Sequence, residues 1–149
     1  MTRVDFYILP DDSSRNLEVF ACRLTEKAYA QGMKVYINTQ SDQQTQSLND
    51  LLWTFKQESF LPHEIAVDGS SADAPIIVGN GVEPEQSNGL LINLAQDVPL
   101  FFSQFERLAE LVNQNEQIKQ NGRERFRFYK DREYQINSHD MTKNSMTDK

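Results

Sequence analysis

The sequence predicts an α/β fold: a single domain with a mainly parallel sheet flanked by helices. Short apolar segments alternate in the first half of the chain with longer segments whose apolar residues recur at helical spacing. Strands that alternate with helices form parallel sheets through right-handed crossovers. A length of 149 residues suits one domain with a sizeable core, and 25% charged beside 38% hydrophobic residues is typical of soluble proteins.

The chain opens with a predicted strand followed by a helix. Residues 4–9 are apolar or aromatic except for Asp5, and Pro10 has no N–H with which to continue a strand ladder. Ser13 or Ser14 can cap the N-terminus of the next helix. The apolar residues of that helix share one face and are Leu17, Ala21, Leu24 and Ala28.

A second strand and a second helix follow. Gly32 ends the first helix, and every second residue of the segment 33–38 is aliphatic, which predicts a strand. Ser41 can cap the second helix. The apolar stripe of this helix consists of Leu48, Leu51, Leu52 and Phe55.

Trp53 lies outside this stripe, about 140–150° from its centre on a helical wheel. Phe60 follows in a segment that Pro62 keeps from continuing as a regular helix. Exposed Trp and Phe side chains close together are candidate anchors of a protein interface. A loop that folds back over Trp53 explains the pattern equally well, so both alternatives stay open.

Two further strands are predicted at residues 75–78 and 90–94. Gly79 and Gly81 follow the first of them, as glycines do in phosphate-binding loops, but the next residues are acidic and start no helix. The ends of the other predicted strands offer no phosphate chemistry either. A nucleotide-dependent enzyme that uses this edge of the sheet is therefore kept only as an alternative.

Residues 101–112 fit two structures. Four apolar residues of the segment have helical spacing: Phe105, Leu108, Ala109 and Val112. Residues 108–112 also suit a strand. The spacing favours a helix at the start of the segment and leaves residues 106–113 undecided between strand and helix.

The last residues, 135–149, show no apolar periodicity. Such polar termini rarely bury enough surface to offset the entropy of ordering the chain. The sequence therefore predicts a domain of residues 1–134 followed by a disordered polar tail.

The stretch from Lys119 to Arg132 holds six basic and two acidic residues, on a chain whose net charge is −7. In a helix, one face of this stretch would present Arg123, Phe126, Arg127 and Lys130. Guanidinium groups bind carboxylates through paired, charge-assisted hydrogen bonds. The face suits an acidic peptide whose terminal carboxylate lies beside an apolar side chain. A merely solvated charged face is the plainer alternative, and direct binding of single-stranded DNA is another, which the acidic chain disfavours.

No catalytic, metal-binding or cofactor-binding arrangement is predicted. His63 and His139 lack metal-ligand spacing, and no GxSxG, phosphate-loop or dinucleotide motif is present. Cys22 is the single cysteine, so no intrachain disulfide forms, and a reducing cytoplasm is the expected location. No apolar run is long enough for a membrane span. A protein that is not an enzyme is expected.

Four segments resemble the chi subunit of bacterial DNA polymerase III holoenzyme. They are the opening VDFYIL, LLWTFKQESFLPH from Leu51 to His63, LLINL, and RERFRFYK from Arg123 to Lys130. The resemblance runs from Val4 to about Tyr134, beyond which the family offers no counterpart. It implies a strand at residues 108–112, which we adopt as the expectation.

The resemblance also implies a function. Chi proteins are clamp-loader accessory subunits with a nucleotide-binding-like fold that bind no nucleotide and reach DNA only indirectly. One surface binds the psi subunit, and its matching positions are Trp53 and Phe60. Another binds the acidic C-terminal tail of single-stranded-DNA-binding protein, which ends in an aromatic residue. The expected tail-binding residues are Arg123, Phe126, Arg127, Val112 and Lys119, with Lys130 on the same face.

Two of these positions depart from the family pattern. Phe126 stands where the family has a tyrosine, so it lacks a phenolic hydroxyl. Arg127 stands where the family has a lysine, so it keeps the charge with a different hydrogen-bonding geometry.

Overall fold

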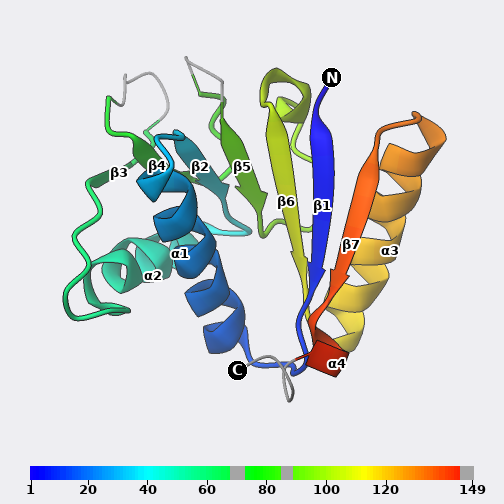
Figure 1. The fold of residues 1–149 in the computed structure, drawn as a ribbon, viewed down its shortest axis with the longest axis horizontal. Coiled ribbons are helices and arrows are strands. Elements are labelled where there is room, and N and C mark those ends of the chain that lie inside the picture. The colour runs from blue at the N-terminus through cyan, green and yellow to red at the C-terminus, as the bar shows by residue number, and fades with distance from the viewer. Residues whose placement is uncertain (68–72, 85–88, 145–149) are drawn as a thin grey trace.

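The computed structural model describes residues 1–67, 73–84 and 89–144. Within these residues, seven parallel strands form one sheet in the order β3-β4-β2-β5-β6-β1-β7 (Figure 1). The elements in chain order are β1 (Arg3–Ile8), α1 (Ser14–Ala30), β2 (Val35–Asn38), α2 (Asp42–Thr54), β3 (His63–Ile65), β4 (Ile76–Gly79), β5 (Leu90–Asn93), η1 (Phe102–Gln104), β6 (Arg107–Val112), α3 (Glu116–Asp131), β7 (Ile136–Asp140) and α4 (Met141–Asn144). The predicted single-domain α/β fold is confirmed.

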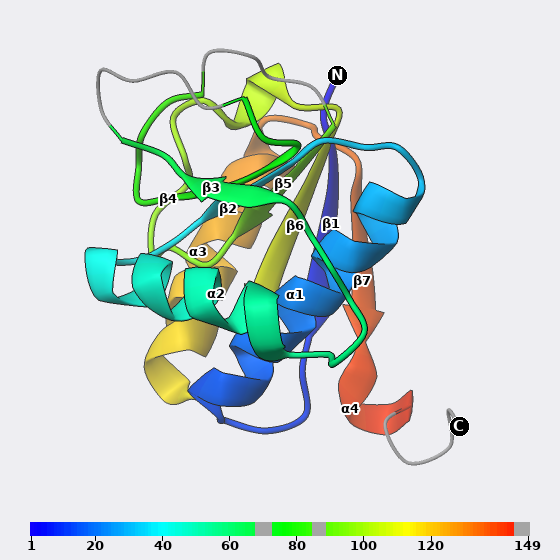
Figure 2. The same cartoon turned by 90° about the vertical axis from the view of Figure 1, so that its left-hand side faces the viewer.

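The helices form two layers around the sheet. Figure 2 shows α1 on one side of the sheet and α3 on the other. Side chains of α1 and α2 pack in one buried cluster, whereas those of α3 pack in a second cluster on the opposite face. Covering both faces is what a parallel sheet requires, because its strands are buried on each side.

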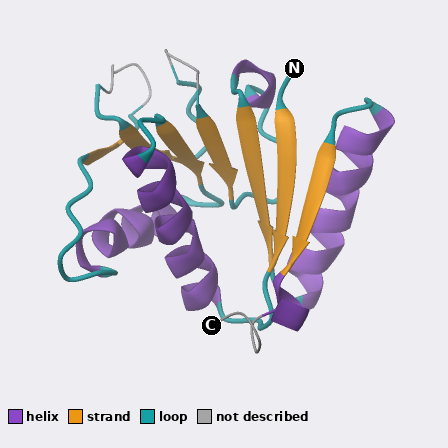
Figure 3. Cartoon of the chain, in the orientation of Figure 1, coloured by secondary structure: helices purple, strands orange, loops and turns teal. Residues whose placement is uncertain are grey.

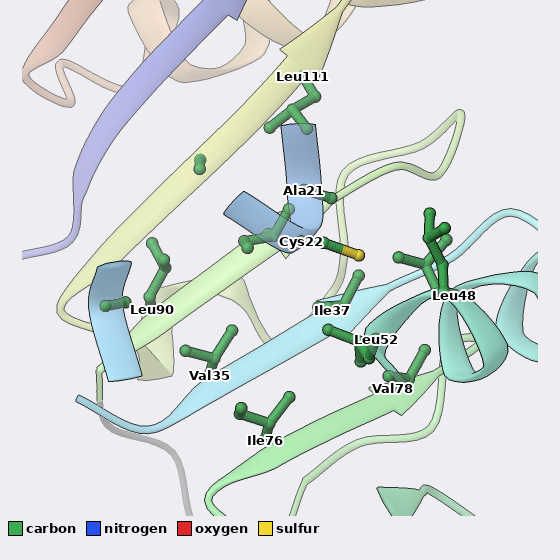
Figure 4. Close-up of a cluster of buried hydrophobic side chains, with 14 of the residues drawn as sticks. Ala21, Cys22, Val35, Ile37, Leu48, Leu52, Ile76, Val78, Leu90 and Leu111 are labelled. Carbon is green, nitrogen blue, oxygen red and sulfur yellow. The ribbon is translucent and has the colours of Figure 1, made fainter. Parts of the chain in front are cut away.

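The cluster under α1 and α2 is built mainly of aliphatic side chains. In Figure 4, Leu48 and Leu52 of α2 point toward Ile37 and Val78 on neighbouring strands, with Cys22 of α1 beside them. Each fully buried aliphatic side chain contributes about 1.5–3 kcal/mol. Burial also raises the pKa of the Cys22 thiol to about 12.

Side-chain caps start the three long helices. Ser13 Oγ accepts from Asn16 N at 3.0 Å, and Ser41 Oγ accepts from Gln44 N at 3.1 Å, which confirms the caps predicted for α1 and α2. Asn115 caps α3, where its Oδ1 accepts from two backbone N–H groups at 3.0 Å. The helix predicted for the basic stretch therefore begins at the residue after Asn115.

Residues 101–112 form a short 3-10 turn and a strand, so the expected helix at the start of the segment is wrong. The turn covers only Phe102–Gln104. β6 follows between β5 and β1, with every residue after Arg107 buried. A strand in the middle of a parallel sheet is apolar on both faces, and its composition resembles that of a buried helix.

Part of the segment expected to be a disordered tail is folded. Figure 3 shows β7 at the edge of the sheet beside β1, where it pairs in parallel, and α4 continues the chain. Disorder from residue 135 is therefore wrong for residues 136–144, while residues 145–149 lie outside the described residues. An edge strand is half solvated, so it tolerates polar residues that hide it from hydropathy patterns. His139 helps hold β7 by stacking on Tyr7 at 4.6 Å and contacting Asp5 at 3.1 Å.

Candidate functional site

Two arginines of α3 lie on opposite sides of the helix. Arg123 is exposed, whereas Arg125 is only 4% exposed. Arg125 Nε donates to Glu110 Oε1 at 2.8 Å, and its Nη1 donates to the Gln96 carbonyl at 2.9 Å. The basic stretch therefore divides into a structural part and a solvent-facing part, which its charge count does not reveal.

Glu110 is the centre of a buried polar network on β6. Tyr129 Oη donates to one carboxylate oxygen at 2.5 Å, and Asn93 Nδ2 lies 3.1 Å from both. Burial raises the pKa of Glu110, and the Arg125 guanidinium opposes that rise. The same burial, together with the Glu110 charge, raises the pKa of Tyr129. Because hydrogen bonds are directional, these contacts set the rotation of α3 about its axis.

That rotation turns the other side of α3 toward a groove of about 820 Å³, which we call the α3 groove. One wall is cationic and consists of Lys119, Arg123, Arg127 and Lys130. The apolar floor consists of Phe6, Ile8, Val112, Gly122 and Phe126. Gln114 and Asp131 also line it, and the wall facing α3 consists of Ser138, Asp140 and Thr142. All six residues expected to bind a peptide tail thus line one cavity.

The cations of the groove are available to a ligand. Among the residues that the structure describes, no ion pair involves Arg123, Arg127 or Lys130. Lys119 Nζ lies 3.9 Å from Glu116 Oε1, a solvent-exposed contact of little strength. An anionic group entering the groove would therefore not have to break a strong internal pair.

The floor depends on a close approach between α3 and β6. A Cβ atom built on Gly122 would lie 2.8 Å from Val112 Cγ2, closer than real atoms pack. Gly122 costs helix stability in the middle of α3, but it lets the helix lie directly on Val112. Phe126 packs edge-on against Phe6 at 5.3 Å between ring centres. The result is an apolar surface beside the cations of α3, suited to one apolar side chain.

The sequence pattern does not mark several of the residues that line the α3 groove. Phe6 and Ile8 come from a strand that the sequence assigns simply to the core. Ser138, Asp140 and Thr142 belong to the segment expected to be disordered. No local pattern marks these positions, because they reach the groove only through the register of β7 beside β1.

A second candidate surface lies on α2 and the loop after it, which we call the aromatic patch (Trp53, Phe60 and His63). Trp53 is 49% exposed and Phe60 is 71% exposed, so the loop does not cover the indole. The two ring centres are 5.7 Å apart, and the His63 ring lies 4.4 Å from the indole. Figures 1 and 2 place α2 and α3 on opposite sides of the sheet, so the patch is separate from the α3 groove.

A smaller crevice of about 360 Å³ lies at the carboxyl ends of β2, β4 and β5. This is the position at which doubly wound sheets hold ligands. Its lining, within the described part of the chain, includes Glu83 and Asp97 and no lysine or arginine. A phosphate group here would meet carboxylates in place of cations.

In the ranges that the structure covers, no three His, Cys, Asp or Glu side chains are grouped so that they could hold a metal ion. None of the helices within those ranges has both the length and the apolar character needed to cross a bilayer.

Comparison with known proteins gives a family. Residues 1–137 match the family described as DNA polymerase III chi subunit, HolC. The DNA polymerase III subunit chi of Pseudomonas aeruginosa is 44% identical over 140 residues, which cover 93% of this chain and 96% of that protein.

Two further chi subunits are similar along most of their length. That of Haemophilus influenzae is 30% identical over 123 residues, covering 82% of this chain and 85% of its own. That of Escherichia coli is 26% identical over 143 residues, covering 93% and 97% respectively. This chain therefore belongs to the family of DNA polymerase III chi subunits, which act in DNA replication.

Proposed function

We propose that this chain is a non-catalytic adaptor of the DNA polymerase III clamp loader, acting in the cytoplasm. The α3 groove binds the acidic C-terminal tail of single-stranded-DNA-binding protein, and the aromatic patch binds the psi subunit. The observation that carries the first part is the cationic wall beside the apolar floor of the groove. Family membership supports both parts.

The groove suits a carboxylate next to an aromatic side chain. Arg123 lines the groove together with Val112 and Phe126, so its guanidinium lies near the apolar floor. A terminal aromatic ring would lie on Val112 and Phe126 while its α-carboxylate pairs with Arg123. Arg127 and Lys130 lie farther along the helix, where they would face acidic residues upstream of the terminus.

The expected affinity is modest. Burying one aromatic side chain contributes about 1.5–3 kcal/mol. Each charge-assisted contact adds about the same amount. Ordering a flexible tail offsets much of this gain. Micromolar binding, about 8 kcal/mol, is therefore the expected order.

Calorimetry with a peptide of several acidic residues and a C-terminal Phe tests this proposal. Arg123→Ala is expected to weaken binding more than Lys130→Ala, because Lys130 stands at the far end of the groove beside Asp131. A peptide with an amidated C-terminus serves as the ligand control, since it lacks the charge that Arg123 would bind. Raising the salt concentration should weaken binding of the free-acid peptide.

Two outcomes would contradict the groove assignment. One is equal loss of affinity in the Arg123 and Lys130 variants, which would indicate a diffuse charge effect. The other is undiminished binding of the amidated peptide. Unchanged melting temperatures of both variants would show that the fold is intact.

The second surface is tested with Trp53→Ala. This variant is expected to abolish co-purification with the psi subunit while leaving tail-peptide affinity unchanged, because the patch and the groove lie on opposite sides of the sheet. Thr54→Ala, an exposed neighbour on the same helix, is the matched control. Loss of psi in both variants, or loss of both ligands with Trp53→Ala alone, would count against a separate psi surface.

A further inference from the structure

His63 joins the two segments that carry the aromatic patch. Its Nε2 lies 3.1 Å from the backbone carbonyl of Asn49 in α2. Its Nδ1 lies 2.6 Å from the carbonyl of Leu61, in the loop that presents Phe60. The ring also packs against Trp53 with 4.4 Å between ring centres. One half-buried side chain therefore contacts both supports of the patch.

Both polar partners of the ring can only accept hydrogen bonds. A neutral imidazole carries one N–H, so in either neutral tautomer one ring nitrogen would point its lone pair at a carbonyl lone pair. The imidazolium ion carries two N–H groups and satisfies both carbonyls. A cation beside an indole is further stabilised by the ring quadrupole.

We infer that His63 is a positioning residue of the aromatic patch: protonated at both ring nitrogens, it ties the Phe60 loop to α2 and holds Trp53 and Phe60 as one surface. The part of this inference that concerns partner binding rests on the proposed psi-binding function. The inference that the His63 ring is protonated at both nitrogens does not depend on that function.

No carboxylate near His63 accounts for a second proton on its ring. Within the described residues, His63 takes part in no ion pair. Asp50, beside Asn49 in α2, accepts from Gln46 at 3.4 Å. Glu64 accepts from two backbone N–H groups beyond β3, and the adjacent strand β4 carries no charged residue. The loop before β3 contains Lys56 and Glu58, both exposed. The two carbonyl oxygens are thus the groups that favour a proton on both ring nitrogens.

NMR of the full chain with isotope-labelled histidine tests the ring directly. At neutral pH, both ring nitrogens of His63 should carry a proton, and the His63→Gln variant assigns the signals. His139, which contacts the Asp5 carboxylate, is the internal reference. A spectrum in which His63 is a single neutral tautomer at neutral pH would overturn the inference, whether or not psi binds.

Binding to the psi subunit tests the positioning role. His63→Phe keeps a ring against Trp53 but donates no hydrogen bond to either carbonyl, so the Phe60 loop is no longer tied to α2, and psi binding should weaken about tenfold. His63→Gln has two N–H donors on one nitrogen and no charge, so it should retain more affinity. His139→Gln is the control and should bind psi normally.

The outcomes separate the two ideas. Equal psi affinity of wild type, Phe and Gln variants would overturn the positioning role. Absence of psi binding by the wild-type chain would instead refute the proposed function of the patch, and the NMR result would still decide the state of the ring. Tail-peptide affinity should be the same in the wild type and in the two His63 variants, which checks that the fold is retained.

Discussion

The two faces of the sheet are held by different chemistry. Under α1 and α2 the buried side chains are mostly aliphatic, such as Leu48 and Leu52, and the one buried carboxylate beside α1 among the described residues, Asp5, pairs with the partly exposed Arg107. Under α3, aromatic rings surround a buried carboxylate, Glu110, which is bonded to Arg125 and Tyr129. Apolar contacts are not directional, whereas hydrogen bonds are.

This difference explains how one helix serves two purposes. The Arg125–Glu110 pair turns one side of α3 to the sheet, and this turn aims Arg123 and Arg127 at the groove. A helix packed only through aliphatic contacts could rotate or slide at lower cost. The helix that hydrogen bonds fix to the sheet is thus the helix that carries the cationic wall.

The largest effect is expected from Glu110→Gln. Removing the carboxylate leaves the buried Arg125 without a counter-ion, which should lower the free energy of unfolding by about 3–5 kcal/mol. Urea denaturation monitored by fluorescence measures this loss.

A compensated variant sharpens the same test. Replacing the network with Glu110→Met, Arg125→Met and Tyr129→Phe together should restore most of the stability, because no unpaired charge remains. If Glu110→Gln proves as stable as the wild type, the directional attachment of α3 does not exist.

On the opposite face, Leu52→Ala should cost about 2–5 kcal/mol through lost burial and the cavity left behind. Leu52→Met, which roughly conserves volume, should cost less than about 1.5 kcal/mol and is the matched control. Urea denaturation again provides the measurement. If Leu52→Met lowers the free energy of unfolding as much as Leu52→Ala does, packing on this face depends on side-chain shape as strictly as the α3 face depends on hydrogen-bond geometry.

Gly122→Ala tests the close approach of α3 to β6. The new methyl group would meet Val112 Cγ2 at 2.8 Å, and such overpacking costs about 1–3 kcal/mol. The gain in helix propensity offsets about 0.5–1 kcal/mol of that cost. The net change is therefore a modest destabilisation, measured by urea denaturation.

In a chain that already carries Val112→Ala, Gly122→Ala should raise the free energy of unfolding instead of lowering it. With the valine methyl groups gone, Gly122→Ala no longer clashes, and only the propensity gain remains. A double-mutant cycle measures the coupling. If the two substitutions change the free energy of unfolding additively, a methyl group at position 122 does not clash with the Val112 side chain.

The smallest effect is expected from labelling Cys22. Its side chain is 0% exposed and its thiol pKa is raised to about 12, so at neutral pH the thiolate is essentially absent. A thiol reagent should react only as fast as the chain unfolds. Rapid labelling of the native chain would show that the apolar face opens locally.

Much of the fold follows from local patterns. The strand from Arg3 to Ile8 and the helices capped by Ser13 and Ser41 were predictable, because caps and periodicity depend on neighbouring residues. β6 was harder, since a strand buried on both faces has no alternation. β7 was missed because an edge strand owes its order to its partner β1.

The candidate site divides in the same way. The helical spacing of Arg123, Phe126 and Arg127 predicted a shared face, and α3 bears it out. The inward turn of Arg125 could not be predicted, because its partner Glu110 lies on another element. Neither could the double contact of His63 with two backbone carbonyls.

Residue order alone thus specified the alternation of strands and helices, the caps, and the gathering of positive charge near one end of an acidic chain. Packing in three dimensions decided which arginine is structural, which strand closes the groove, and which aromatic side chains stay exposed. The physical reason is range: periodicity and capping act between residues a few positions apart. Burial and ion pairing depend instead on distant segments that meet only when the sheet forms.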